Sequence, residues 1–182
     1  CFSLQMLQEH HRDEEAAKVE QLKDKIETSF RKVFLNEYGY LLDYVDGNLM
    51  NWDVRPNMLF AIALDFSPLS REEKKSVLDI CTRELVTPKG IRSLSPKSGG
   101  YNPMYMGPQK QRDEAYHQGT AWPWLMGFYL EAYLRVYKMS GLTFIERQLI
   151  GFEEELSYHC LGSIPELFDG NPPFHGRGAI SF

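Results

Sequence analysis

The side chains best suited to chemistry lie in one stretch of nine residues, 116–124. It contains a phenol, an imidazole, an amide and two indoles, carried by Tyr116, His117, Gln118, Trp122 and Trp124. Flat aromatic faces beside directional hydrogen-bonding groups suit a ligand with apolar C–H faces and a rim of hydroxyls, such as a sugar. The alternative is a buried helix start whose aromatic residues fill a core, because aromatic side chains dominate ordinary cores too.

The composition argues against several other classes of function. At 182 residues the chain is long enough for one domain with a hydrophobic core. Its formal net charge of -5 argues against a nucleic-acid partner, and no apolar run approaches the length of a membrane span. The cysteines at 1, 81 and 160 are far apart, which predicts reduced thiols rather than a disulfide framework or a zinc site. We therefore expect a cytoplasmic protein without a metal or other cofactor.

Hydrophobic periodicity predicts amphipathic helices at three places. Over residues 14–34 the apolar side chains recur at steps of three and four, opposite a charged face. A capping box at residues 70–73 predicts the start of a second helix. Another capping box at 143–146 predicts a third, which continues to about residue 159.

Two further helices are predicted to be apolar on nearly every side, over residues 58–64 and 120–139. Thr120 would cap the second, with Pro123 in its first turn, where a missing N–H costs nothing. Wholly apolar helices must be enclosed by others, so their alternation with amphipathic ones predicts an all-α fold with two concentric helical layers.

The segments between these helices are long and polar, and they hold most of the remaining aromatic residues. A turn at residues 46–47 predicts a short hairpin. Residues 87–116 and 162–170 show no periodicity and are expected to form irregular loops. A site built from these loops at one end of the helices would bring their polar side chains together.

Four of these segments, taken together, resemble the C-terminal catalytic domain of glycogen debranching enzymes, the amylo-α-1,6-glucosidase family. They are Asp-Val-Arg-Pro-Asn at 53–57, residues 85–96, the Arg-Asp-Glu-Ala run that leads into 116–124, and Gly-Ser-Ile-Pro-Glu-Leu-Phe-Asp-Gly at 162–170. The resemblance implies an α/α toroid of six helical hairpins that cleaves by inversion. Residues 1–182 would be one domain, truncated at both ends and covering roughly the C-terminal half of the toroid.

The resemblance also implies roles for individual residues. Glu166 would be the general base of hydrolysis. Substrate would be bound by a set of polar and aromatic residues: Asp53, Arg55, Asn57, Tyr116, His117, Gln118, Gly119, Trp122 and Trp124. The family's general acid lies in a Thr-Trp-Met-Asp segment upstream, so the missing N-terminal part of the same domain would be a partner. The other partner would be an α-glucan or oligosaccharide.

Each role has an alternative that the residues alone leave open. Glu166 would otherwise be a capping or surface glutamate, because glutamates are mostly exposed. Arg55 would pair with Asp53 to hold a helix start. His117 would be a buried histidine with satisfied hydrogen bonds. One of the two tryptophans would line the pocket and the other would pack into the core, since residues two apart at a helix start point in different directions.

The resulting hypothesis is a glycoside hydrolase domain that cleaves α-1,6-glucosidic branch points of glycogen or related α-glucans. One alternative is a fragment that binds glucan, or nothing, without catalysis because it lacks the general acid. Another is a different glucosidase of the same helical architecture, such as a trehalase-like enzyme.

Overall fold

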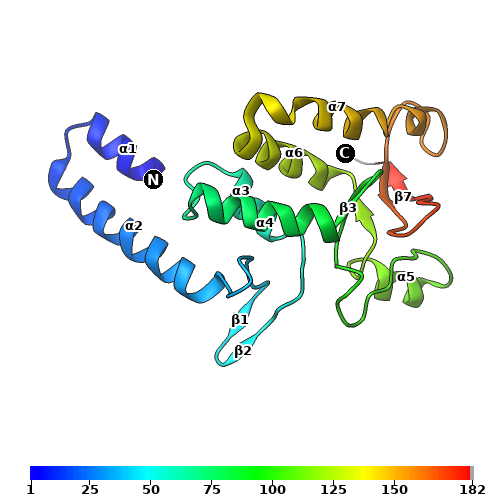
Figure 1. The fold of residues 1–182 in the computed structure, drawn as a ribbon, viewed down its shortest axis with the longest axis horizontal. Helices are drawn as coiled ribbons and strands as arrows, with labels where there is room; N and C mark the ends of the chain where they lie inside the picture. The colour runs from blue at the N-terminus through cyan, green and yellow to red at the C-terminus, as the bar shows by residue number, and fades with distance from the viewer. Residues whose placement is uncertain (181–182) are drawn as a thin grey trace.

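The computed structural model describes residues 1–180, which form a mixed α/β structure (Figure 1). Its helices are α1 (Phe2–Glu9), α2 (Asp13–Phe34), α3 (Met58–Ala63), α4 (Arg71–Glu84), α5 (Gln109–Ala115), α6 (Trp124–Tyr137) and α7 (Leu142–Ile150), with 3-10 turns η1 (Lys138–Gly141) and η2 (Glu154–Ser157). Its strands are β1 (Val45–Asp46), β2 (Leu49–Met50), β3 (Val86–Thr87), β4 (Gly90–Arg92), β5 (Ala121–Trp122), β6 (Pro165–Phe168) and β7 (Gly176–Ile180). Strands β1 and β2 form a hairpin, and β3 to β7 form one antiparallel sheet in chain order.

The predicted all-α toroid is therefore wrong for the described residues, which contain two antiparallel sheets. Most of the strands have two or three residues, too few to show the period-two alternation that marks a strand in sequence. Strands β4 and β6 also lie in the segments 87–116 and 162–170, whose glycines and prolines predicted irregular loops. Glu166 is consequently a strand residue, not a loop residue.

Several local predictions are confirmed. The hydroxyl of Ser70 accepts from the N–H of Glu73, whose carboxylate accepts from the N–H of Ser70, so α4 begins with the predicted capping box. The turn predicted at residues 46–47 joins β1 to β2. Helix α2 follows its periodicity, but Leu22 and Ile26 on its apolar face are 55% and 56% exposed. That face is therefore only partly covered by the described residues.

The start of α6 differs from the prediction. The helix begins at Trp124, because Ala121 and Trp122 pair with the neighbouring strands as β5. Thr120 does not cap the helix, since its hydroxyl donates to the carbonyl of Tyr116. Residues 116–124 thus comprise a turn, a short buried strand and a helix start, where one continuous helix had been expected from residue 120.

The third amphipathic helix is also shorter than predicted. Helix α7 begins at Leu142 without a side-chain cap, so the expected capping box at 143–146 is not formed. The helix ends at Ile150, and the chain continues through η2 instead of remaining helical to residue 159. In residues 1–180 no helix combines the length and the apolar character needed to cross a membrane.

The core lies where α3, α4 and α6 pack together against the sheet. Its fully buried side chains come from all of these elements: Leu59, Ile62, Val77, Leu78, Ile91, Tyr129, Leu167 and Phe168. Burial in this core also raises the pKa of the Cys81 thiol. The hairpin of α1 and α2 lies at one end of the structure in Figure 1 and the sheet at the other. The core thereby fixes the segment before α3 beside strands β4 and β5.

Candidate functional site

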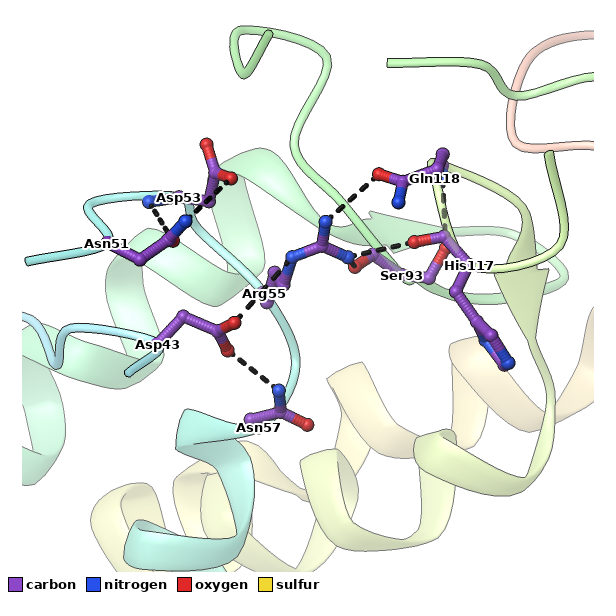
Figure 2. Close-up of polar contacts among 9 residues, drawn as sticks. Asp43, Asn51, Asp53, Arg55, Asn57, Ser93, His117 and Gln118 are labelled. Carbon is purple, nitrogen blue, oxygen red and sulfur yellow. Dashed lines mark hydrogen bonds and ion pairs between the residues drawn. The ribbon is translucent and has the colours of Figure 1, made fainter. Parts of the chain in front are cut away.

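Arg55 is the centre of a network that joins three segments distant in sequence. It lies just before α3, and Figure 2 shows its guanidinium directed at two other chain segments. One terminal nitrogen donates to the carbonyls of Ser93 and His117, at 3.1 and 2.8 Å. The other donates to the amide oxygen of Gln118 at 2.9 Å. Because a guanidinium donates in a rigid planar fork, these acceptors fix both its position and its plane.

The charge of Arg55 is balanced by Asp43, in the loop before the β1–β2 hairpin. The Nε of Arg55 lies 3.7 Å from one Asp43 oxygen, and the other oxygen accepts from the amide of Asn57 at 2.7 Å. Asp53 instead accepts from the amide of Asn51 at 3.3 Å, on the side of the network away from Asn57 (Figure 2). In the described structure Arg55 therefore pairs with Asp43, and the alternative pairing with Asp53 is not formed.

The turn that carries His117 is held by hydrogen bonds to its neighbours. The hydroxyl of Ser93 accepts from the N–H of Gly119 at 2.9 Å. The hydroxyl of Thr120 donates to the carbonyl of Tyr116 at 2.7 Å and accepts from the indole N–H of Trp122 at 3.1 Å. With its donors and acceptors paired inside the protein, this turn presents its aromatic rings in a fixed orientation.

A cleft of about 280 Å³ opens beside these rings. The ring of His117 stacks on Trp122 with centroids 5.2 Å apart and planes 17° apart. The cleft is lined by polar groups and apolar faces: Arg55, Pro56, Asn57, Phe60, Ser93, His117, Trp122, Trp124 and Leu125. Trp122 is 8% exposed and Trp124 is 49% exposed, yet both reach the cleft. Aromatic walls with amide and imidazole edges are chemically suited to a sugar.

The environment of His117 favours its neutral form. Partial burial, and then the positive charge of Arg55, lower the pKa of His117. A neutral imidazole carries one hydrogen-bond donor and one acceptor, whereas the imidazolium carries two donors. The ring can therefore both donate to and accept from a hydroxyl in the cleft.

Glu166 adjoins the cleft through Tyr116. The phenol of Tyr116 donates to one oxygen of the half-buried Glu166 carboxylate at 2.5 Å. Burial, followed by this hydrogen bond and the charge of Glu166, raises the pKa of Tyr116 to about 12. The Tyr116 ring also lies 4.6 Å from His117 and 4.8 Å from Trp122, centroid to centroid. One aromatic ring thus connects the carboxylate to the wall of the cleft.

A second opening, of about 490 Å³, lies beside Tyr105 and Gly178. Its lining is partly cationic and comprises Tyr105, Met106, Gly107, Arg112, His159, Arg177 and Gly178. Gly178 is also the backbone neighbour of the Glu166 carboxylate. No Asp or Glu of the described residues lines either this opening or the cleft. Nor do the His, Cys, Asp and Glu residues of 1–180 form any group of three that could hold a metal ion.

The structure brings most of the predicted site residues close together, but only some of them line the cleft. The cleft is lined by five of them: Arg55, Asn57, His117, Trp122 and Trp124. Gln118 and Gly119 do not line it; the Gln118 side chain accepts from Arg55, and the Gly119 N–H donates to Ser93. Tyr116 and Glu166 form the adjoining pair, and Asp53 is bonded to Asn51 instead of to the network.

Two residues of the network were not assigned a role from the sequence. Asp43 was one of several acidic residues in predicted loops, and nothing in its neighbours distinguished it from the others. Ser93 lies in the segment 85–96 that carries the family resemblance, but a single serine gives no signal of its own. Both act through contacts with residues at least 14 positions away, Asn57 for Asp43 and Gly119 for Ser93.

Comparisons with known proteins show which proteins the chain is similar to. The model of a protein family described as amylo-alpha-1,6-glucosidase matches residues 2–181. The glycogen debranching enzyme of Saccharomyces cerevisiae (strain ATCC 204508 / S288c) is 33% identical over 112 residues. That match covers 56% of this chain and 7% of the yeast protein, so the chain corresponds to a small part of the relative's length.

Proposed function

The chain belongs to the amylo-alpha-1,6-glucosidase family, and from this premise we propose that it forms part of a glycoside hydrolase domain that removes α-1,6-linked glucose from glycogen or a related α-glucan. The observation that carries the proposal is the hydrogen bond through which Tyr116 connects Glu166 to the wall of the cleft. Tyr116 donates to the Glu166 carboxylate and packs against His117 and Trp122, two residues of the cleft wall. A proton acceptor therefore lies one aromatic ring away from a sugar-sized aromatic cleft.

In the proposed reaction Glu166 is the general base. It takes a proton from a water molecule as the water oxygen bonds to the anomeric carbon of the sugar. The glycosidic C–O bond breaks on the opposite face, and a general acid protonates the leaving oxygen. Because attack and departure occur on opposite faces, α-linked glucose is released as β-glucose.

The general acid is proposed to come from another part of the domain. Inverting hydrolases hold their two carboxyl groups about 6.5–9.5 Å apart, with room for the water molecule. No carboxyl group of the described residues lines either opening beside Glu166. A general acid outside residues 1–180 would complete the pair.

The cleft residues are proposed to hold the glucose unit. The indole faces of Trp122 and Trp124 suit the apolar C–H face of the sugar, and His117 and Asn57 supply polar edges for its hydroxyls. Arg55 has a different part. Its terminal nitrogens are already bonded to Ser93, His117 and Gln118, so it orients the cleft more than it binds sugar.

The experiment that tests this function is Glu166→Gln in the intact protein. The substrate is a maltooligosaccharide that carries one α-1,6-linked glucose, and the readout is free glucose. We expect turnover to fall by about 10²–10⁴-fold, the usual effect of losing an acid–base group, with little change in substrate binding. Glu153→Gln, on an exposed residue, should leave turnover unchanged. Near-normal turnover by Glu166→Gln would remove Glu166 from the mechanism.

A second candidate is a segment that binds glucan without catalysis. The observation in its favour is that no carboxyl group of the described residues, Glu166 included, lines either of the two openings. Under this alternative the intact protein would bind maltooligosaccharides in calorimetry, and Glu166→Gln would change neither affinity nor glucose release.

Trehalose serves as the control substrate for the trehalase-like alternative. A trehalase-like enzyme would hydrolyse it, and a debranching glucosidase would not.

A further inference from the structure

The strands around Glu166 deviate from a regular ladder at that residue. Leu167 of β6 pairs with Arg177 of β7, and Pro165 pairs with Ile180, so the register shifts between them. Two residues of β7, Gly178 and Ala179, therefore lie opposite Glu166 alone. Gly178 has a φ of +72°, the left-handed conformation of the glycine in one common type of β-bulge. Such bulges recur beside active sites, where they redirect a side chain.

The bulge provides space for the Glu166 carboxylate. A methyl group at Gly178 would collide with one carboxylate oxygen and would lie 3.1 Å from the Cβ of Glu166. The N–H of Ala179 points at the same oxygen from 3.4 Å. The carboxylate thus lies against bare backbone on the β7 side, and any side chain at Gly178 would displace it.

The opposite side of the carboxylate is held by Tyr116. Its hydroxyl donates to the oxygen that does not face β7, at 2.5 Å. The Tyr116 ring is itself fixed by contacts with Tyr105, His117 and Trp122, with centroids 5.5, 4.6 and 4.8 Å away. A hydroxyl on a ring fixed in this way gives the carboxylate little freedom to rotate.

An ion pair between the buried Asp169 and the partly exposed Arg177 anchors the bulge. Asp169 is fully buried, and one of its oxygens accepts from Arg177 at 2.7 and 3.1 Å. Its other oxygen accepts from the backbone N–H of Tyr105 at 2.8 Å. Arg177 directly precedes Gly178, and Tyr105 packs on Tyr116. Asp169 therefore holds the neighbours of both Gly178 and Tyr116, the two residues that contact the Glu166 carboxylate.

We propose that Tyr116 and Gly178 are positioning residues that together fix the Glu166 carboxylate for proton transfer from water. The inference rests on the proposed function, in which Glu166 is the general base. Tyr116 supplies a directed hydrogen bond to one oxygen, and Gly178 supplies the space for the other. Neither residue needs to touch the sugar, which separates this role from substrate binding.

The first test is Gly178→Ala in the intact protein. Misplacing a catalytic group by about 1 Å can cost about 10²-fold, so we expect kcat to fall by about 10–10²-fold with KM nearly unchanged. The matched control is Gly100→Ala. Gly100 has a similar φ of +77°, but a methyl group there would meet nothing within 4 Å. The control separates backbone strain from displacement of the carboxylate.

The second test is Tyr116→Phe, which keeps the ring and removes the hydrogen bond. A hydrogen bond to a charged group contributes roughly a factor of ten or more, so kcat should fall about tenfold. KM should stay nearly unchanged, because Tyr116 does not line the cleft. Tyr101→Phe removes a hydroxyl that donates to Asn171 at 2.8 Å, and its kcat and KM should match those of the unmodified protein.

The outcomes separate this inference from the proposed function. If Glu166→Gln is inactive while both positioning variants match their controls in kcat, the positioning role is refuted and the function stands. If Tyr116→Phe raises KM with kcat unchanged, Tyr116 binds substrate, and its positioning role is refuted. If Glu166→Gln retains turnover, the function fails and this inference fails with it. Should Gly178→Ala not fold, Tyr116→Phe and its control still decide the result.

Discussion

The two tryptophans that reach the cleft should respond differently to removal. The side chain of Trp122 is 8% exposed, and its indole N–H donates to Thr120. Trp124 is 49% exposed and packs on Phe60 and Phe128 at the surface end of α6. Trp122→Ala should therefore lower the free energy of unfolding by about 3–5 kcal/mol, the usual cost of deleting a buried aromatic side chain. Trp124 buries about half as much area, so Trp124→Ala should cost roughly half of that.

The assay is urea denaturation of the intact protein, followed by hydrogen exchange in peptides from α6. Exchange at α6 reports on this region even if other parts of the protein unfold separately. Trp52→Ala is the control, because Trp52 is 42% exposed and contacts Tyr38 near the β1–β2 hairpin. Its removal should leave the protection of α6 unchanged.

Trp124→Ala should lose more affinity for sugar than Trp122→Ala, although Trp122→Ala should lose more stability. For Trp124→Ala we expect weaker maltooligosaccharide binding, by up to about tenfold, from the loss of an exposed aromatic face. Equal losses of stability in the two variants would refute the division between a buried and an exposed indole. Unchanged affinity in Trp124→Ala would refute its place in the sugar site.

Two further predictions concern the surroundings of the site. Burial, then the charge of Arg55, lower the pKa of His117, so protonation opposes folding. The contribution of neutral His117 to the free energy of unfolding should be complete above pH about 6.5. It should decline as the pH falls through that value towards the lower pKa of the folded state. NMR titration of the ring should give a midpoint below about 6.5. Ser70→Ala removes the capping box of α4 and should lower the free energy of unfolding by about 1 kcal/mol in urea denaturation, with turnover unchanged. A loss of turnover there would show that α4 affects the site more directly than its packing implies.

The sequence predicted the helices best where their signals are local. The reciprocal hydrogen bonds of Ser70 and Glu73 join residues three apart, so the capping box can be recognised from the sequence without any tertiary structure. The periodicity of α2 can be recognised for the same reason, since its apolar residues recur at steps of three and four along the chain. Thr143 and Glu146 have the same spacing, yet no box forms there, because α7 already begins at Leu142. A capping motif therefore predicts a helix start only where the preceding chain is free to turn.

The sheet could not be predicted from local patterns. Ala121 and Trp122 form β5 because Ile91 and Arg92 pair with them on one side and Phe168 on the other, and all of these contacts are long-range. A strand of two residues has no periodicity of its own. The same limit applies to the site. The residues of the stretch 116–124 were predictable by type, whereas the partners Asp43 and Ser93 are brought in only by the fold.

The most direct test of an inverting α-1,6-glucosidase is the anomer of the glucose that it first releases. The intact protein is mixed with a maltooligosaccharide that carries one α-1,6-linked glucose, and proton NMR follows the anomeric signals before mutarotation equilibrates them. Attack by water activated by Glu166, on the face opposite the leaving group, predicts that β-glucose appears first. Initial release of α-glucose would mean retention of configuration and would contradict the role assigned to Glu166.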